Sequence, residues 1–116
     1  MVTNFFIPDQ FDIILIDHDP QLGSEMSKRR PCLVLSKRLL NATTKRVLVC
    51  PITSTAPQSY LHLRLPSNQK NSSGTILLDQ IKSLDFKSRN AKKIDELRDL
   101  KLYDDIVELI ALIIKR

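Results

Sequence analysis

The 116-residue sequence contains no tryptophan and only six aromatic residues, four Phe and two Tyr, which excludes a broad platform for stacking nucleic-acid bases. No apolar run reaches the roughly 18 residues that a membrane span needs. The opening residues, MVTNFFIPDQ, lack the basic flank and the small-residue cleavage site of a signal peptide. We therefore expect a single domain, residues 1–116, that works in the cytoplasm.

Cysteine is also scarce. Cys32 and Cys50 each lie in an apolar, strand-like run, without CxxC spacing and without a histidine cluster nearby. This arrangement excludes the usual zinc motifs. We expect both cysteines to be small core residues, and we expect neither a metal site nor a cofactor.

Positive charge, in contrast, is abundant and unevenly distributed. Residues 1–93 carry 14 Lys and Arg against seven Asp and Glu, whereas residues 94–116 carry four against six. A basic body with a mildly acidic tail favours a polyanionic partner, although a solvated surface can have the same composition.

Short apolar runs separated by turn residues dominate the first eighty positions. They are IILID (13–17), CLVLS (32–36), RVLVCPI (46–52), LHLRL (61–65) and TILLDQI (75–81). This pattern predicts a small, mostly antiparallel sheet or a partly open barrel. The segments between these runs, KRLLNATTK (37–45) among them, have the composition of loops. His62, within an alternating strand, is expected to be structural rather than catalytic.

The end of the chain changes to a helical period. Apolar residues spaced three and four apart predict one face of an amphipathic helix, namely Tyr103, Ile106, Val107, Ile110, Ile113 and Ile114. Asp99 is the expected N-cap of this helix. Its apolar face most simply closes the core of the sheet, and binding to a partner is the less favoured alternative.

Three ordered motifs carry a family resemblance. DIILIDHDPQLGSEMSKRRPCLVLS (12–36), VLVCPIT (47–53) and ILLDQIKSLD (76–85) resemble, in order and spacing, the sequence blocks of the MazF/PemK family of toxin endoribonucleases. The resemblance extends over roughly residues 11–114.

The resemblance implies a fold that is mainly β with a C-terminal α-helix, an SH3-like and partly open barrel, assembled as a homodimer. It also implies a type II toxin that cleaves single-stranded RNA without metal and is silenced by a cognate antitoxin. In that chemistry the ribose 2′-OH attacks the adjacent phosphate, so the protein must position the RNA, move protons and neutralise phosphoryl charge.

Arg30 is the first candidate for catalysis, because its guanidinium stays charged and offers a planar fork to phosphate oxygens. Pro31 fixes the backbone beside it. By resemblance, Arg30 matches the catalytic arginine of the family and Thr53 matches the catalytic threonine. Glu25 could accept the 2′-OH proton or orient Arg30, and the proton carriers stay open.

The expected RNA-binding residues complete the candidate site: Ser24, Lys28, Arg29, Asp79 and Gln80. Asp79 and Gln80 could line the RNA groove or serve the fold. Ser24 replaces a histidine of the Kid-like members and Leu77 replaces their catalytic arginine, so the chain is closer to the MazF-like members. Phe11 stands where the family usually has glycine.

Two other functions remain possible at this point. A CcdB-like toxin of the same barrel type would bind DNA gyrase and cleave nothing, and it would have no obvious use for Arg30 and Thr53 in these settings. A non-catalytic homologue would bind nucleic acid in a salt-sensitive way without forming product.

Overall fold

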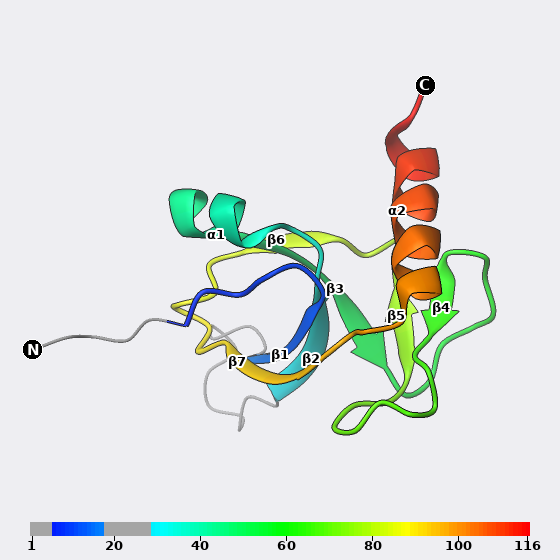
Figure 1. Ribbon diagram of the computed structural model, residues 1–116, viewed down its shortest axis with the longest axis horizontal. Coiled ribbons are helices and arrows are strands. Elements are labelled where there is room, and N and C mark those ends of the chain that lie inside the picture. Colours follow the sequence, from blue (N-terminus) through cyan, green and yellow to red (C-terminus); the bar gives the residue numbers. More distant parts are fainter. Residues whose placement is uncertain (1–5, 18–28) are drawn as a thin grey trace, which may run out of the picture.

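The computed structural model describes residues 6–17 and 29–116, and an antiparallel sheet forms its centre (Figure 1). The strands are ordered β4-β5-β3-β2-β1-β7, and β6 pairs with β3. The elements are β1 (Asp12–Asp17), β2 (Arg29–Val34), α1 (Arg38–Thr44), β3 (Val47–Thr53), β4 (His62–Arg64), β5 (Thr75–Leu77), β6 (Lys82–Leu84), β7 (Lys92–Glu96) and α2 (Leu100–Ile114). The predicted fold class is confirmed. Within the described residues, neither helix combines the length and apolar character of a membrane span.

Both faces of the sheet are buried, because the central strands carry apolar residues at consecutive positions. Ile13 and Ile14 are each fully buried, yet they belong to different clusters, since successive strand residues point to opposite faces. Ile13 packs in the cluster that holds Cys50, and Ile14 packs in the cluster that holds Cys32. Both thiols are free and buried, which confirms that the cysteines are core residues.

The helix α2 covers the first of these clusters as far as Ile110. The carboxylate of Asp99 accepts a hydrogen bond from the backbone amide of Leu102 at 3.0 Å, as expected of the N-cap. Ile106 is buried, whereas Val107, Ile113 and Ile114 are 57%, 43% and 74% exposed. The prediction that the whole apolar face closes the core is therefore wrong for Val107 and for the last turn. A 15-residue helix is about 22 Å long, and its end extends beyond the sheet (Figure 1).

Phe11 and Tyr103 join the start of β1 to α2. Their rings stack with centroids 4.3 Å apart and planes 9° apart. Phe11 has φ 68°, in the left-handed region where glycine is favoured. Its amide donates to Val34 O and its carbonyl accepts from the amide of Leu97, each at 2.8 Å. The ring stack therefore offsets a backbone conformation that costs about 1–2 kcal/mol.

The loop-like composition of residues 37–45 predicts a loop, but Arg38–Thr44 form the short helix α1, which has no side-chain cap. Hydrogen bonds to distant residues hold this helix in place. The buried side-chain amide of Asn41 donates to Pro8 O at 2.8 Å and to Ser36 O at 3.0 Å.

The strand β7 was also not predicted, because its sequence, KKIDE, is mostly polar. Pairing with β1 stabilises it. Lys93 also lies 3.3 Å from the buried carboxylate of Asp12.

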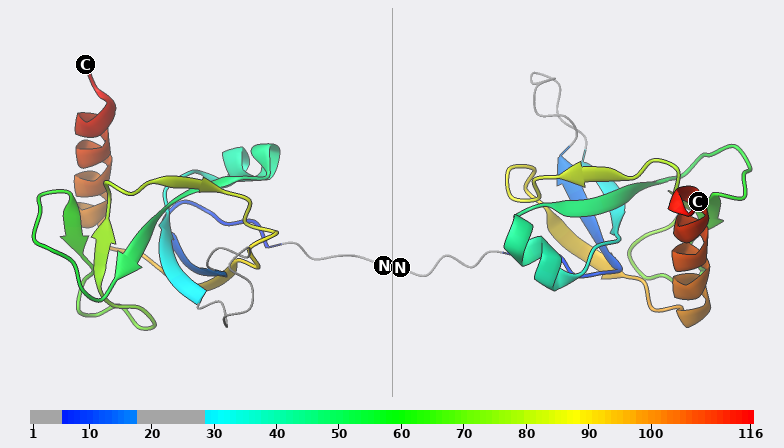
Figure 2. Two further views of the ribbon diagram at one scale, coloured as in Figure 1. Left: turned by 180° about the vertical axis from the view of Figure 1, so that it is seen from behind. Right: turned by 90° about the horizontal axis from the view of Figure 1, so that it is seen from above.

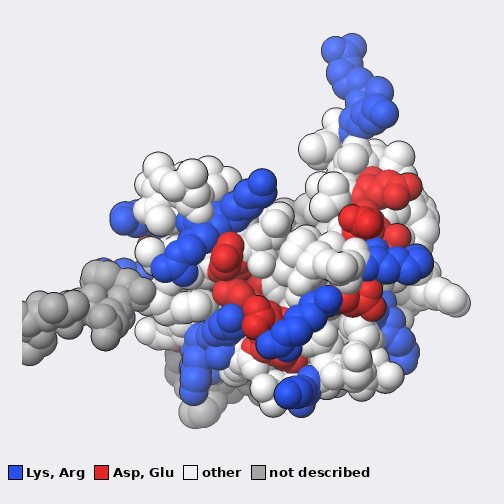
Figure 3. Space-filling view, viewed as in Figure 1, with Lys and Arg blue, Asp and Glu red and all other residues white. Residues whose placement is uncertain are grey.

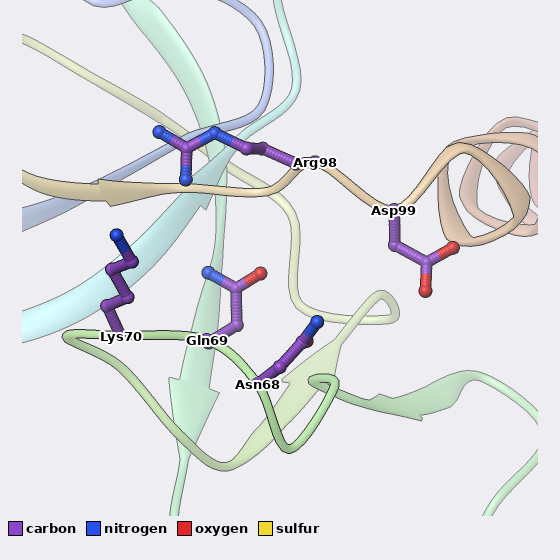
Figure 4. Close-up of a pocket in the computed structure, with 5 residues that line it drawn as sticks. All are labelled: Asn68, Gln69, Lys70, Arg98 and Asp99. Carbon is purple, nitrogen blue, oxygen red and sulfur yellow. The ribbon is translucent and has the colours of Figure 1, made fainter.

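Asp95 of β7 fixes the loop of residues 66–74. Its Oδ2 accepts hydrogen bonds from Gln69 Nε2 at 2.9 Å, from the amide of Asn71 at 3.0 Å and from Ser72 Oγ at 2.9 Å. Figure 4 shows Gln69 reaching from this loop toward the β7–α2 connection. Burial raises the pKa of Asp95, but these hydrogen bonds and one from the amide of Glu96 outweigh burial and hold the pKa below its ordinary value.

We predict that Asp95→Asn lowers the free energy of unfolding by about 1–3 kcal/mol at neutral pH. Asparagine has only one oxygen, so its side-chain NH2 group would take the place of one carboxylate oxygen. Hydrogen bonds that the Asp95 carboxylate now accepts would be lost or weakened. Because the folded-state pKa is lowered, the contribution of Asp95 is fully present above the unfolded-state pKa of about 4 and is lost as the pH falls below it. Urea unfolding between pH 7 and pH 3 should show the parent and the variant converging, and a constant difference would contradict this account.

Candidate active site

Arg30 lies near the start of β2, opposite Ile16 of β1. Its side chain is exposed and lines a cavity of about 350 Å³ on the sheet face that carries Cys32. The cavity is lined by Ile16, Asp17, Arg30, Cys32, Val49, Pro51, Gln80, Lys82, Leu84 and Arg89. Residues from all three family-like sequence motifs thus meet around one cavity.

Three of the residues that line this cavity are cations, namely Arg30, Lys82 and Arg89. Burial raises the pKa of the Cys32 thiol to about 11, and the nearby positive charges of Lys82, Arg30 and Arg89 oppose that rise. All three positive charges are therefore close enough to Cys32 to act on its thiol. Sequence reasoning missed Lys82 and Arg89. Lys82 could have been found from its place in ILLDQIKSLD, two residues after Gln80, whereas Arg89 gives no such signal.

Arg29 has a different task from its neighbour. Its Nε lies 3.3 Å from Asp17 Oδ1, and its guanidinium also donates to the carbonyl of Asn90. Asn90 Nδ2 in turn donates to Asp17 Oδ2 at 2.7 Å. Arg30, in contrast, forms no ion pair with any described residue. Of the two arginines, Arg30 is therefore the one whose fork is available to a phosphate.

Thr53 ends β3, two residues after Pro51, which pairs with Cys32 in the β2–β3 ladder and lines the cavity with Arg30. The Thr53 hydroxyl donates to Thr55 O at 3.1 Å, so it sits in a turn at the end of the strand. Thr53 thus lies at the strand end next to the cavity, and it is not one of the residues that line it.

Gly74, the residue before β5, lies directly against the backbone of Thr53. It has φ 122°, and a Cβ added there would lie 2.5 Å from the carbonyl oxygen of Thr53. Thr75, the next residue, pairs with Thr53 in the β3–β5 ladder. Only glycine allows this close approach of the two backbones.

The remaining candidates divide into two groups. Gln80 lines the cavity with Arg30, whereas the carboxylate of Asp79 lies 3.2 Å from His62 Nε2. Ser24, Glu25 and Lys28 lie outside the described residues. Among the described residues, no group of three His, Cys, Asp or Glu is arranged to hold a metal ion.

A second polar cavity, of about 430 Å³, lies between the 66–74 loop and the start of α2. It is lined by Asn68, Gln69, Lys70, Arg98 and Asp99 (Figure 4). None of its residues belongs to the three motifs, and Arg98 is paired with Glu96 at 2.8 Å. On the face viewed in Figure 3, acidic side chains form a band between the cations. The positive charge is therefore not continuous on that face. The Arg30 cavity is the better candidate for the functional site, because residues of all three motifs line it.

Known proteins are similar to this chain in sequence and in fold. The family described as "PemK-like, MazF-like toxin of type II toxin-antitoxin system" matches residues 9–114. Endoribonuclease toxin MazF of Escherichia coli (strain K12) is 34% identical over 88 residues, which cover 76% of this chain and 78% of that protein. Endoribonuclease PemK of Escherichia coli is 27% identical over 89 residues, covering 74% and 67% of the two chains.

Solved structures agree with the sequence comparison. MazF from Deinococcus radiodurans matches with a TM-score of 0.82 at 29% identity, covering 97% of this chain and 100% of that chain. A MazE-MazF complex from the same organism matches with a TM-score of 0.81 at 26% identity, over 96% and 98% of the two chains. The fold and the family match define a toxin of a type II toxin–antitoxin system. More particularly, the chain belongs to the PemK-like, MazF-like family, which confirms the predicted resemblance.

We predict that Gly74→Ala destabilises the protein by about 2–4 kcal/mol, because the added methyl group meets the Thr53 backbone and the positive φ strains any L-residue. RNA cleavage should fall as well, since Thr53 would be displaced. Chemical denaturation and a cleavage assay measure the two effects. Ser73→Ala, at the exposed neighbouring position, is the matched control, and equal stability of both variants would refute the assigned role of Gly74.

Proposed function

We propose that this toxin, an endoribonuclease, cleaves single-stranded mRNA in the cavity lined by Arg30. The ribose 2′-OH attacks the adjacent phosphorus and loses its proton, the bond to the 5′-oxygen breaks, and that oxygen gains a proton. The products carry a 2′,3′-cyclic phosphate and a 5′-OH, and no metal ion takes part. The observation that carries this proposal is the exposed Arg30 guanidinium. It forms no ion pair with the described residues, and it lines one cavity with Lys82 and Arg89, next to the strand that ends at Thr53.

Each group has a task that suits its chemistry. Arg30 neutralises the charge that grows on the phosphoryl oxygens, and the Thr53 hydroxyl donates to the same phosphate. Lys82 and Arg89 bind neighbouring phosphates of the chain. Glu25 orients Arg30 or accepts the 2′-OH proton; an arginine is a poor proton donor because its pKa exceeds about 12.

The same cations explain how an antitoxin would silence the enzyme. A segment rich in carboxylates would pair with Arg30, Lys82 and Arg89 and exclude the RNA phosphates. Such a segment can remain disordered until it binds, which allows it to wrap around the toxin. The toxin would meet both its antitoxin and its mRNA in the cytoplasm.

We also propose that the toxin is a homodimer, and that the exposed end of α2 packs against α1 of a second copy. Exposed apolar side chains gather on both helices, with Leu39 80% exposed on α1 and Ile114 74% exposed on α2. Burying these apolar side chains against each other would stabilise the pair.

The arrangement of the helices fits a two-fold symmetric pair. β3 and β6 run between α1 and α2 in the view from above, and both helices project from the sheet (Figure 2). Leu48 of β3, 40% exposed, lines a surface hollow with Leu40 of α1 and extends the apolar surface from α1 onto β3. A two-fold axis would bring each α2 onto the opposite α1 and bury both sets of apolar residues.

We predict that Arg30→Ala lowers the rate of RNA cleavage by about 10²–10³-fold or more without loss of fold, because the side chain is exposed and lies outside the core. The assay incubates a long mixed-sequence RNA with EDTA and maps the fragment ends. Arg98→Ala, which removes an arginine from the second cavity, is the matched control and should cleave like the parent. Full turnover by Arg30→Ala would refute the mechanism, and intact RNA with the parent would favour a gyrase-directed toxin or a binding-only homologue.

For the dimer, we predict that Leu39→Asp or Ile113→Asp yields a monomer at micromolar concentration, because each buries a charge in the proposed interface. Leu100→Asp is the control, since Leu100 is 73% exposed at the opposite end of α2. Sedimentation equilibrium measures the mass. A monomeric parent would disprove homodimerisation, and variants that stay dimeric would place the interface elsewhere.

A further inference from the structure

His62 lies beside the cavity without belonging to it. The residue is on β4, opposite Leu77 of β5, and its side chain is only 9% exposed. Its Nδ1 lies 2.7 Å from the carbonyl oxygen of Pro57, and its Nε2 lies 3.2 Å from Asp79 Oδ1. The imidazole therefore bridges two segments that are far apart in the sequence.

Both bridged segments border the proposed cleavage site. Pro57 belongs to the loop of residues 54–60, which leaves β3 directly after Thr53. Asp79 directly precedes Gln80, which lines the cavity with Arg30. A change at the imidazole would therefore act on the Thr53 loop and on the Gln80 turn together.

The two contacts place a strict demand on the imidazole, because both partners are hydrogen-bond acceptors. Neutral imidazole has one N–H group, whereas the charged ring has two. Both contacts can be hydrogen bonds only when His62 is charged; in the neutral ring, one nitrogen lone pair faces an acceptor oxygen. Histidine is the side chain that ordinarily changes charge between about pH 5 and pH 8.

Among the described residues, few charged groups lie near His62. Asp79 is the charged group in contact with the ring, and its side chain is 44% exposed. The 54–60 loop, STAPQSY, has no Asp, Glu, Lys or Arg, and neither does β5. Tyr60 is the titratable residue of that loop, and Arg64, the other charged residue of β4, pairs opposite Thr75. Asp79 is thus the counter-ion of a charged His62.

We propose that His62 is a positioning residue of the endoribonuclease. In its charged form it holds the 54–60 loop and the Asp79–Gln80 turn in the arrangement that binds RNA, and loss of its proton releases Asp79 and weakens RNA binding. Thr53 stays in place because it pairs with Thr75 in the β3–β5 ladder, and Arg30 is held by β1. The change therefore acts on the loop beyond Thr53 and on Gln80, so KM responds and kcat does not. The inference rests on the proposed cleavage site.

The first test needs no RNA and so does not depend on the proposed function. Nitrogen-15 spectra of the His62 ring, recorded across the histidine range from about pH 5.5 to pH 8, report which nitrogens carry protons. We expect both nitrogens to be protonated at the lower pH, and the amides of Gln58 and Gln80 to shift with the same midpoint as the ring. A ring that is neutral throughout, or amides that do not follow it, would overturn the proposal.

The second test measures RNA cleavage at the two ends of that range. The KM of the parent should rise about tenfold toward high pH, as one charge-assisted hydrogen bond is lost. His62→Gln, which carries no proton switch, should have a raised KM at both pH values and an unchanged kcat. Tyr60→Phe, in the same loop, should keep the pH dependence of the parent. The same KM profile in His62→Gln and the parent would refute the proposal, whereas an inactive parent would refute only the cleavage function.

Discussion

The antiparallel register of β2 between β1 and β3 determines which side chains can meet at the cavity. Successive strand residues point to opposite faces, so a slip of one residue would turn Arg30 to the face opposite Lys82. The apolar residues in the two clusters differ in size, so a slip would leave voids and clashes on both faces of β1, β2 and β3. The geometry of the proposed site is therefore set by hydrophobic packing some distance from the Arg30 guanidinium.

Around this rigid centre, a few polar contacts fix the peripheral segments. Asp95 holds the 66–74 loop, Gly74 brings β5 against Thr53, and His62 joins the 54–60 loop to the turn after β5. β4 and β5 have only three residues each, so the ladder alone supplies little stability there. Single contacts in this half of the molecule consequently control loop position, and with it access to the cavity.

The sequence predicted those elements that are set by local pattern. The apolar strands, the helix α2 and its Asp99 cap follow from periodicity and capping, and the three motifs identified the region of Arg30, Thr53 and Gln80. Elements held by distant partners were missed. α1 depends on Asn41 reaching Pro8, and β7 depends on pairing with β1. Lys82 and Arg89 join the site only because β6 and the turn after it fold over Cys32. The length of the sheet, which leaves the end of α2 uncovered, is likewise a tertiary property.

The Phe11–Tyr103 stack also bears on how the chain folds. One ring precedes the first strand and the other lies in the last helix, so the contact closes nearly the whole chain into a single loop. Contacts between such distant residues are entropically costly to form and slow folding. Glycine at position 11 would suit the backbone but would leave α2 without this anchor. By using phenylalanine there, the chain ties its C-terminal helix directly to the residue that precedes β1.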